Sequence, residues 1–317
     1  MKSILLVKTS SLGDVAHNLP VASDIQHAFP DAAIDWVVEE NFSAVPRAHA
    51  AVRHVFPVAI RRWRRAPWRR TVWAEIAAFA RSLRRERYDA VIDTQGLLKS
   101  ALIARAARGM RYGLDWRSSR EPLGVFYDRT FSVPWTRHAV ERNRALAAHA
   151  LDYAVSPEVQ YGIRASPAGF AWLPQNRYAV LLHSTTSARK LWPESRWSEL
   201  GQYFAQRGVR CIVPWGSTAE RVRGERLAQD VGDSIVPPLL PLQEVMALLA
   251  GAQAVIGVDT GLAHLAAALG VATVGIYCAT DPARTGVYGS ARGANVGGVN
   301  MTPEVSDVIR ALEKVTP

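Results

Sequence analysis

The stretch that decides the fold is Val255-Ile256-Gly257-Val258-Asp259-Thr260-Gly261-Leu262-Ala263-His264-Leu265. Its short apolar run is typical of a buried parallel strand, and the Ala/Leu-rich run that follows Gly261 has the composition of a helix. The segment therefore predicts a strand, a turn and a helix. The first turn of such a helix exposes unpaired N–H groups and the positive end of the helix dipole, so this turn is suited to bind a phosphate.

The tripeptide Asp259-Thr260-Gly261 also occurs in aspartic proteases, and the two interpretations must be separated. The protease dyad needs two carboxylates that share a proton. This chain carries only one such tripeptide, and a helical pattern follows it. The context therefore disfavours the protease interpretation.

Working outward from this segment, strand-like and helix-like runs alternate along all 317 residues. In the first half we expect strands near 3–8, 33–38, 54–58 and 88–93, and helices near 14–28, 71–86, 97–108 and 138–151. In the second half we expect strands near 178–183, 209–213, 234–236, 253–258 and 272–277, and helices near 195–207, 217–231, 241–250 and 260–269. This alternation predicts an α/β fold with parallel sheets and crossover helices, in two Rossmann-like domains.

The expected domain boundaries follow from turn-forming residues. We expect a first domain over residues 1–155, a turn-rich linker over 156–176 that begins with Ser156-Pro157, and a second domain over 177–300. The remaining 301–317 contains a helix, about 303–315, that has no obvious partner strand and could pack back across the domains. Ligands of such sheets bind outside the carboxyl ends of the strands, so we expect the two domains to face a central cleft.

Composition narrows the class of protein. The apolar run at the start is too short for a signal peptide, and no apolar stretch of about 18 residues occurs, so we expect a soluble cytoplasmic protein. The formal net charge of +10 requires an anionic partner but does not choose among nucleic acid, acidic lipid and phosphorylated metabolite. Much of the charge lies in the arginine- and tryptophan-rich segment 61–70.

The first predicted strand is followed by the polar turn Lys8-Thr9-Ser10-Ser11-Leu12-Gly13-Asp14, which opens a helix. Asp14 could cap or begin that helix, or it could project into a cleft and act as a general base. The turn carries neither the dinucleotide-binding glycine pattern nor the P-loop pattern. Dehydrogenases and nucleoside triphosphatases are therefore disfavoured.

Polar residues also follow strands of the second half. Thr185, Thr186 and Lys190 could hold phosphate oxygens, or simply form a polar loop before a helix. Glu220 could accept hydrogen bonds from ribose hydroxyls, or complement the dipole in the first turn of its helix. His264 lies one helical turn after Thr260, where it could reach a ligand or be a core histidine.

Taken together, these loops resemble those of the bacterial lipopolysaccharide heptosyltransferases. The resemblance covers nearly the whole chain and rests on motifs that are specific as a set: Lys8 to Val15, Trp36-Val37-Val38-Glu39-Glu40, Ile60-Arg61-Arg62-Trp63-Arg64, Tyr88-Asp89-Ala90-Val91-Ile92-Asp93, Thr185 to Trp192, Pro214-Trp215-Gly216 and Val258 to Leu265. It implies two Rossmann-like domains in the GT-B arrangement, with the acceptor on the first and ADP-heptose on the second. It also implies inversion at the anomeric carbon, with no essential metal and no cofactor.

Within the family, the chain resembles the enzymes that add the first heptose of the inner core, to a Kdo hydroxyl of Kdo2-lipid A. The alternative within the family is transfer to a later core sugar. The resemblance gives Asp14 the role of general base. It assigns the donor to the diphosphate contacts Thr185, Thr186 and Lys190, to the ribose contact Glu220, and to the loop residues Asp259, Thr260, Gly261, Leu262 and His264. Because Arg189 precedes Lys190, either cation could serve the leaving diphosphate.

The arginine-rich segment then has a specific interpretation. Kdo carboxylates and lipid A phosphates suit arginine forks, so we expect acceptor contacts from Arg61, Arg62 and Arg64, and from Arg120 in a later loop. Tryptophans among arginines also suit the interface of an anionic membrane, which predicts a peripheral position on the cytoplasmic face of the inner membrane. The bland alternative is a solvated loop before a helix. A basic nucleic-acid-binding protein is the non-enzyme alternative, but no nucleic-acid motif accompanies the basic run, so we expect no nucleic-acid partner.

Overall fold

The computed structural model describes residues 2–167, 169–173, 177–232 and 234–316. The chain divides into two compact units, Met1–Ile163 and Arg164–Pro317. This division lies inside the stretch that we expected to be a linker. Residues 168 and 174–176 of that stretch, and the terminal residues 1 and 317, lie outside the described part of the chain.

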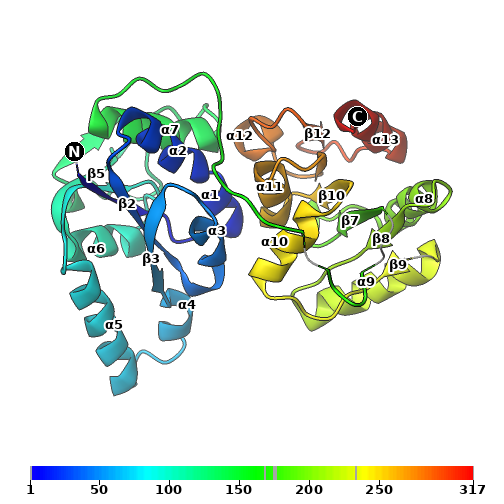
Figure 1. The fold of residues 1–317 in the computed structure, drawn as a ribbon, viewed down its shortest axis with the longest axis horizontal. Coiled ribbons are helices and arrows are strands. Elements are labelled where there is room, and N and C mark those ends of the chain that lie inside the picture. The colour runs from blue at the N-terminus through cyan, green and yellow to red at the C-terminus, as the bar shows by residue number, and fades with distance from the viewer. Residues whose placement is uncertain (1, 168, 174–176, 233, 317) are drawn as a thin grey trace. The chain divides into compact units, whose positions relative to one another are not determined.

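The first unit is a parallel sheet in the order β3-β2-β1-β4-β5-β6 (Figure 1). Its strands are β1 (Ser3–Val7), β2 (Ala33–Glu39), β3 (Val52–Val58), β4 (Arg87–Asp93), β5 (Arg108–Leu114) and β6 (Arg129–Phe131). Its helices are α1 (Leu12–Ala16), α2 (Leu19–Ala28), α3 (Ala44–Arg47), α4 (Ile60–Trp63), α5 (Arg70–Leu83), α6 (Leu98–Ala106) and α7 (Ala139–Leu151), with short 3-10 turns η1 (Glu40–Phe42) and η2 (Gly124–Phe126).

The second unit is a parallel sheet in the order β12-β11-β10-β7-β8-β9. Its strands are β7 (Tyr178–Leu182), β8 (Arg210–Ile212), β9 (Ser234–Ile235), β10 (Ala254–Val258), β11 (Thr273–Tyr277) and β12 (Gly293–Gly297). Its helices are η3 (Ala188–Lys190), α8 (Glu194–Ala205), α9 (Thr218–Val231), α10 (Leu242–Ala250), α11 (Gly261–Ala268), α12 (Pro282–Thr285) and α13 (Val305–Val315). Counted from its own first strand, each sheet has the order 3-2-1-4-5-6 of a Rossmann fold, so the predicted fold class is confirmed.

Helices cover both faces of each sheet. In the first unit, α5 and α6 pack with the apolar side chains of β1 and β4 in one core, and α2 and α7 contact each other on the other face (Figure 1). In the second unit, α8 and α13 contribute to one core while α10 and α11 contact each other and α11 packs on β10 and β11. Each unit therefore has its own hydrophobic core. In both units, loops follow the carboxyl ends of the strands.

Two expectations about helices and strands need correction. The expected helix 14–28 is two helices, because Pro20 cannot continue α1 and instead lies in the first turn of α2. The strands β5, β6 and β12 were not predicted, because their sequences are rich in arginine or glycine rather than in apolar residues.

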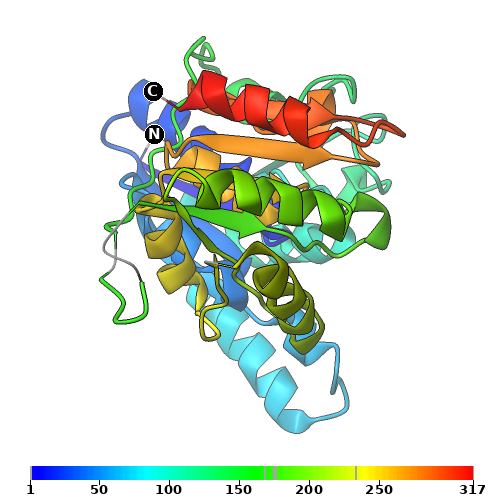
Figure 2. The same cartoon turned by 90° about the vertical axis from the view of Figure 1, so that its right-hand side faces the viewer.

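The last helix also differs from its expectation. It does have a partner strand, because α13 contacts β12 and β11 and buries Val308 and Leu312 in the core of the second unit. Figure 2 shows this helix, in red, beside that edge of the sheet. The apolar face of α13 is buried in the second unit. This face therefore gives no support to the expectation that α13 could pack back across the domains. Within the described residues, no helix is long and apolar enough to span a bilayer.

Candidate functional site

The candidate site begins where the strand order of each sheet reverses. In the second unit this point lies between β7 and β10, which are paired neighbours. Ligands of open α/β sheets bind outside the carboxyl ends of the strands at this point. Thr185 follows β7, Asp259 follows β10, and Thr280 follows the neighbouring β11, so three loops bring polar side chains to one edge.

Asp259 is the centre of this group. Its Oδ2 lies 2.7 Å from Lys190 Nζ and accepts a 2.7 Å hydrogen bond from Thr280 Oγ1. His264 Nε2 lies 3.7 Å from Asp259 Oδ1, which is an electrostatic contact longer than a hydrogen bond. Thr185 Oγ1 donates to the main-chain carbonyl of Asp259 at 2.8 Å. The loops after three strands are thus tied to one buried carboxylate.

The charge state of Asp259 follows from these contacts. Burial alone would raise the pKa of its carboxyl, but the contacts from His264, Lys190 and Thr280 outweigh burial and hold the pKa well below its usual range. Asp259 is therefore an anion at any physiological pH. The carboxylate in turn holds the Lys190 ammonium at the carboxyl edge of the sheet.

Other predicted diphosphate contacts are more exposed. Thr186 and Arg189 are exposed and make no side-chain hydrogen bond or ion pair within the described residues, whereas Lys190 is half-buried and paired. The geometry therefore favours Lys190 over Arg189 as the fixed cation of the loop. This fixed position is what a group that stabilises a leaving diphosphate needs.

The Asp259-Thr260-Gly261 turn connects a strand to a helix, as predicted. Thr260 is the extended residue before α11, and its side chain makes no capping hydrogen bond. Gly261 and Leu262 begin the helix and are partly exposed, while His264 is buried on its next turn. The first N–H groups of α11 are thus left for a ligand, as the sequence indicated.

Glu220 lies in the first turn of α9, as the structural interpretation of this residue predicted. Its Oε2 accepts a 2.7 Å hydrogen bond from the Gly216 N–H, and its own N–H donates to Ser217 Oγ at 3.3 Å. The carboxylate therefore closes the turn between β8 and α9. Its Oε1 makes no other hydrogen bond within the described residues, so one oxygen is left for a ribose hydroxyl.

In the first unit, Asp14 closes the first turn of α1 with one of its two carboxylate oxygens. Its Oδ2 accepts hydrogen bonds from Ser11 N at 2.7 Å and from Ser11 Oγ at 2.9 Å, which closes the first turn of α1. Its Oδ1 has no partner among the described residues. One oxygen thus holds the carboxylate in place and the other is open to accept a proton.

Two lysines, Lys8 and Lys99, interact electrostatically with this carboxylate. Lys8 is buried at the end of β1, where its Nζ donates to the Thr94 carbonyl at 2.7 Å. Burial lowers the pKa of Lys8, the carboxylates of Asp14 and Asp93 oppose this, and the charges of Arg142 and Arg120 add to the lowering. Arg120 is therefore close enough to Lys8 for their positive charges to repel each other. Its side chain is exposed.

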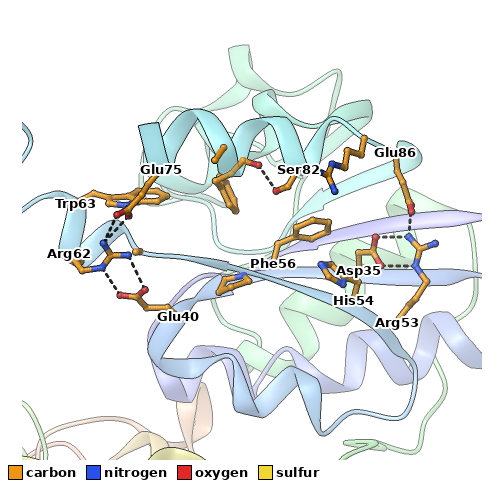
Figure 3. Close-up of a pocket in the computed structure, with 15 residues that line it drawn as sticks. Asp35, Glu40, Arg53, His54, Phe56, Arg62, Trp63, Glu75, Ser82 and Glu86 are labelled. Atoms are coloured by element: carbon orange, nitrogen blue, oxygen red, sulfur yellow. Dashed lines mark hydrogen bonds and ion pairs between the residues drawn. The ribbon is translucent and has the colours of Figure 1, made fainter. Parts of the chain in front are cut away.

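The arginines of segment 61–70 differ in their freedom. Figure 3 shows a pocket of about 830 Å³ in the first unit, where Arg62 lies between Glu40 and Glu75. The Arg62 guanidinium makes hydrogen bonds of 2.8 and 3.1 Å to Glu75 and of 3.3 Å to Glu40. Arg62 would have to break these pairs to bind an acceptor, so its expected role is weakened.

Arg61 and Arg64 remain available. The Arg61 guanidinium lies 5.0 Å from the centre of the Phe42 ring. The main-chain N–H of Arg61 donates to the buried Glu39 carboxylate, which fixes the start of α4. Arg64 is exposed and has no side-chain partner within the described part of the chain. Arg61 and Arg64 therefore remain candidates for binding an anion.

Sequence reasoning missed Thr280, Lys99 and Gln95. Thr280 lies in the loop after β11 and donates a hydrogen bond to Asp259. Lys99 Nζ donates to Ser10 Oγ at 2.5 Å, and Gln95 Oε1 accepts from Thr9 N and Ser10 N. Gln95 could have been found from its position in the sequence, because it follows the predicted strand 88–93 as Asp14 follows the first strand.

Comparison with known proteins agrees with this geometry. Residues 76–313 match the profile of glycosyltransferase family 9 (heptosyltransferase). The chain is 47% identical over 290 residues to lipopolysaccharide heptosyltransferase 1 of Escherichia coli K12, covering 90% of this chain and 91% of that protein. The solved structure of the E. coli heptosyltransferase WaaC with ADP superposes with a TM-score of 0.89 and 41% identity, covering 99% of this chain and all of that one. A WaaC structure with ADP-2-deoxy-2-fluoro heptose gives a TM-score of 0.85, 41% identity, and 98% and 99% coverage.

Proposed function

Because this chain belongs to glycosyltransferase family 9, the heptosyltransferases, we propose that it transfers L-glycero-D-manno-heptose from ADP-heptose to a Kdo hydroxyl of Kdo2-lipid A. The observation that carries the donor assignment is the group of loops around Asp259 and Lys190. The relatives that support it include an enzyme named lipopolysaccharide heptosyltransferase 1 and a structure that holds ADP. The acceptor assignment rests on that named relative and on the exposed arginines of the first unit.

In the proposed reaction, an acceptor oxygen attacks the anomeric carbon of the heptose as the bond between that carbon and the diphosphate oxygen breaks. Asp14 Oδ1 takes the proton of the attacking hydroxyl, and ADP leaves with the bonding pair. A single in-line displacement with one base gives inversion. The reaction requires Asp14 of the first unit and the donor loops of the second to reach the same sugar.

The leaving ADP needs positive charge and hydrogen-bond donors. Lys190, the hydroxyls of Thr185 and Thr186, and the first N–H groups of α11 supply them in this proposal. Glu220 Oε1 binds the ribose, while Asp259 and His264 orient the heptose. ADP-heptose is a substrate, and the positive groups of this loop take the part that a metal plays in other transferases, so we assign no cofactor or metal.

The acceptor is anionic and lies in a membrane, which fits the first unit. We propose that Arg61, Arg64 and Arg120 bind its carboxylates and phosphates, with Arg62 holding the segment in place. Trp68 and Trp73 are 76% and 62% exposed beside these arginines, which suits a peripheral contact with the anionic face of the inner membrane.

The test is release of ADP from ADP-heptose in the presence of Kdo2-lipid A. Asp14→Asn removes the base but keeps a side chain that Ser11 can hydrogen-bond, so we expect turnover to fall about 10²–10⁴-fold with ADP affinity nearly unchanged. Wild-type turnover in this variant would contradict the role of Asp14. A panel of later core acceptors decides the alternative, because turnover of those in place of Kdo2-lipid A would assign the chain to a later step.

A further inference from the structure

Gln95 lies at the strand-order reversal of the first unit, in the turn after β4. Asp93, which is fully buried, shapes this turn by accepting hydrogen bonds from Gln95 N at 2.8 Å and Gly96 N at 3.2 Å. Gly96 has a φ of +66°, which a glycine adopts without strain. Tyr127 OH donates to the other oxygen of Asp93 at 2.7 Å. The buried Asp93 carboxylate therefore holds the main chain of Gln95 in place.

The side-chain oxygen of Gln95 is fully used. Its Oε1 accepts hydrogen bonds from Thr9 N and Ser10 N, both at 3.1 Å. Because main-chain N–H groups only donate, the oxygen of the amide must face them, and the orientation of the amide is determined. The Nε2 group is consequently turned away from this loop. Within the described part of the chain, it makes no hydrogen bond.

The loop that Gln95 holds is the one that holds Asp14. Ser11, the next residue, donates through both its N–H and its hydroxyl to Asp14 Oδ2. Lys99, in the first turn of α6, holds the same loop through Ser10 Oγ. Gln95 is thus connected to the carboxylate through three consecutive residues, and its unused donor lies on the same edge of the sheet.

We propose that Gln95 acts on both sides of this site: its Oε1 positions the loop that carries Asp14, and its Nε2 donates to an oxygen of the anionic sugar acceptor. The proposal rests on the proposed function, which makes Asp14 the base and the first unit the acceptor side. An amide is suited to this combination, because it offers an acceptor and a donor on one rigid plane. A carboxylate at this position would keep the first role and lose the second.

Two variants separate the roles. Gln95→Glu keeps an oxygen for Thr9 N and Ser10 N but loses the donor and adds a negative charge. Assayed at pH 8, it should raise the acceptor KM at least tenfold and leave the donor KM and Tm unchanged. Gln95→Met removes both functions at similar volume, so it should also lower kcat about tenfold and speed hydrogen exchange in the peptide that covers Thr9 to Asp14. Gln202→Glu, on the exposed face of α8, is the matched charge control and should change none of these.

An acceptor KM within twofold of wild type in Gln95→Glu would overturn the donor role. Unchanged hydrogen exchange and kcat in Gln95→Met would overturn the positioning role. Kinetics are measured with whichever acceptor of the panel the wild type turns over, and the exchange measurement needs no acceptor. If another acceptor of the panel is turned over in place of Kdo2-lipid A, the proposed function fails while both parts of this proposal are still decided.

Discussion

At the scale of single residues, Asp259 organises the donor side through contacts that arrive from separate loops. Thr280 donates to the Asp259 carboxylate, and its contribution can be removed without changing charge. Thr280→Val should raise the donor KM several-fold, because loss of a hydrogen bond to a charged group costs about 1–3 kcal/mol and loosens the Lys190–Asp259 pair. Thr280→Ser should restore the wild-type value.

The control for Thr280 is available on the adjoining strand. Thr273 lies at the other end of β11, is fully buried, and donates to the Val271 carbonyl at 2.8 Å. Thr273→Val should lower Tm without changing the donor KM. Equal KM values for wild type and Thr280→Val, measured by ADP release, would show that Thr280 has no part in positioning the donor loops.

The residues of the site were predictable where one rule applied, namely that ligands lie after the strands of a parallel sheet. That rule found Asp14, Lys190 and Asp259, because each follows a run that is apolar enough to be recognised as a strand. It did not reveal that Lys190 and Asp259 form a pair, or that Thr280 joins them. These contacts link residues up to 69 positions apart, and no spacing in the sequence encodes them.

At the scale of elements, His49 ties together parts of the first unit. Its Nε2 lies 3.0 Å from Ser23 Oγ of α2, its Nδ1 accepts from Ala51 N at 3.0 Å, and a Cβ at Gly162 would lie 2.3 Å from its ring. Burial lowers the pKa of His49 to about 4, against a small opposing effect of a hydrogen bond to the Leu19 main chain. The folded state therefore holds this imidazole neutral.

This pKa predicts a specific dependence of stability on pH. The unfolded chain binds the His49 proton below about 6.5, and the folded chain binds it only near 4, so this contribution is complete above 6.5 and is lost as the pH falls towards 4. From pH 7.5 to pH 5, wild type should lose about 2 kcal/mol of unfolding free energy more than His49→Gln. Urea denaturation at both pH values measures this difference, and parallel losses in the two proteins would contradict it.

The α4–α5 projection provides a second prediction about an element. Figures 1 and 2 show these helices extending from the body of the first unit. The linking segment carries Trp68, and Trp73 Nε1 donates to the Pro67 carbonyl at 2.9 Å. If this projection contacts the membrane, the double variant Trp68→Ala/Trp73→Ala should bind phosphatidylglycerol-containing vesicles several-fold more weakly, and added salt should weaken wild-type binding.

The matched control for the projection is Trp116→Ala, which removes a tryptophan of similar exposure from the loop after β5. Vesicle sedimentation without the acceptor measures binding alone. Equal loss in the two variants would show that exposed tryptophans matter in general and that this projection has no special role.

The elements that the sequence predicted are those with apolar periodicity. The central strands are almost entirely buried, and their apolar runs predicted them from the sequence: β1, β4, β7 and β10. β5 and β12 lie towards sheet edges, are only partly buried, and carry arginine or glycine, so their sequences resemble loops. Because β12 was not predicted, α13 had no expected partner strand, whereas the structure packs this helix against β12 and β11.

At the scale of the whole molecule, the chain contains the same strand order twice, once in each unit. The two reversals of strand order carry different chemistry. In the first unit, Gln95 and Lys99 hold the loop of Ser11, which donates to a carboxylate with one oxygen that no described residue contacts. In the second, a buried carboxylate fixes a lysine beside the open start of a helix. Under the proposed function, one fold presents a proton acceptor in one unit and a diphosphate site in the other.

This division predicts how the activity separates. The second unit has its own sheet and a core formed by α8, α9, α13 and the strands, so the fragment Arg164–Pro317 should fold on its own. Because the proposed ADP contacts, Thr185, Lys190 and Glu220, all belong to it, the fragment should bind ADP within a few-fold of the full chain by calorimetry. It should release no ADP from ADP-heptose with acceptor present, since Asp14 belongs to the other unit. A folded fragment with a cooperative thermal transition and no affinity for ADP would show that the donor site needs residues of the first unit, and the donor assignment would have to be extended to that unit.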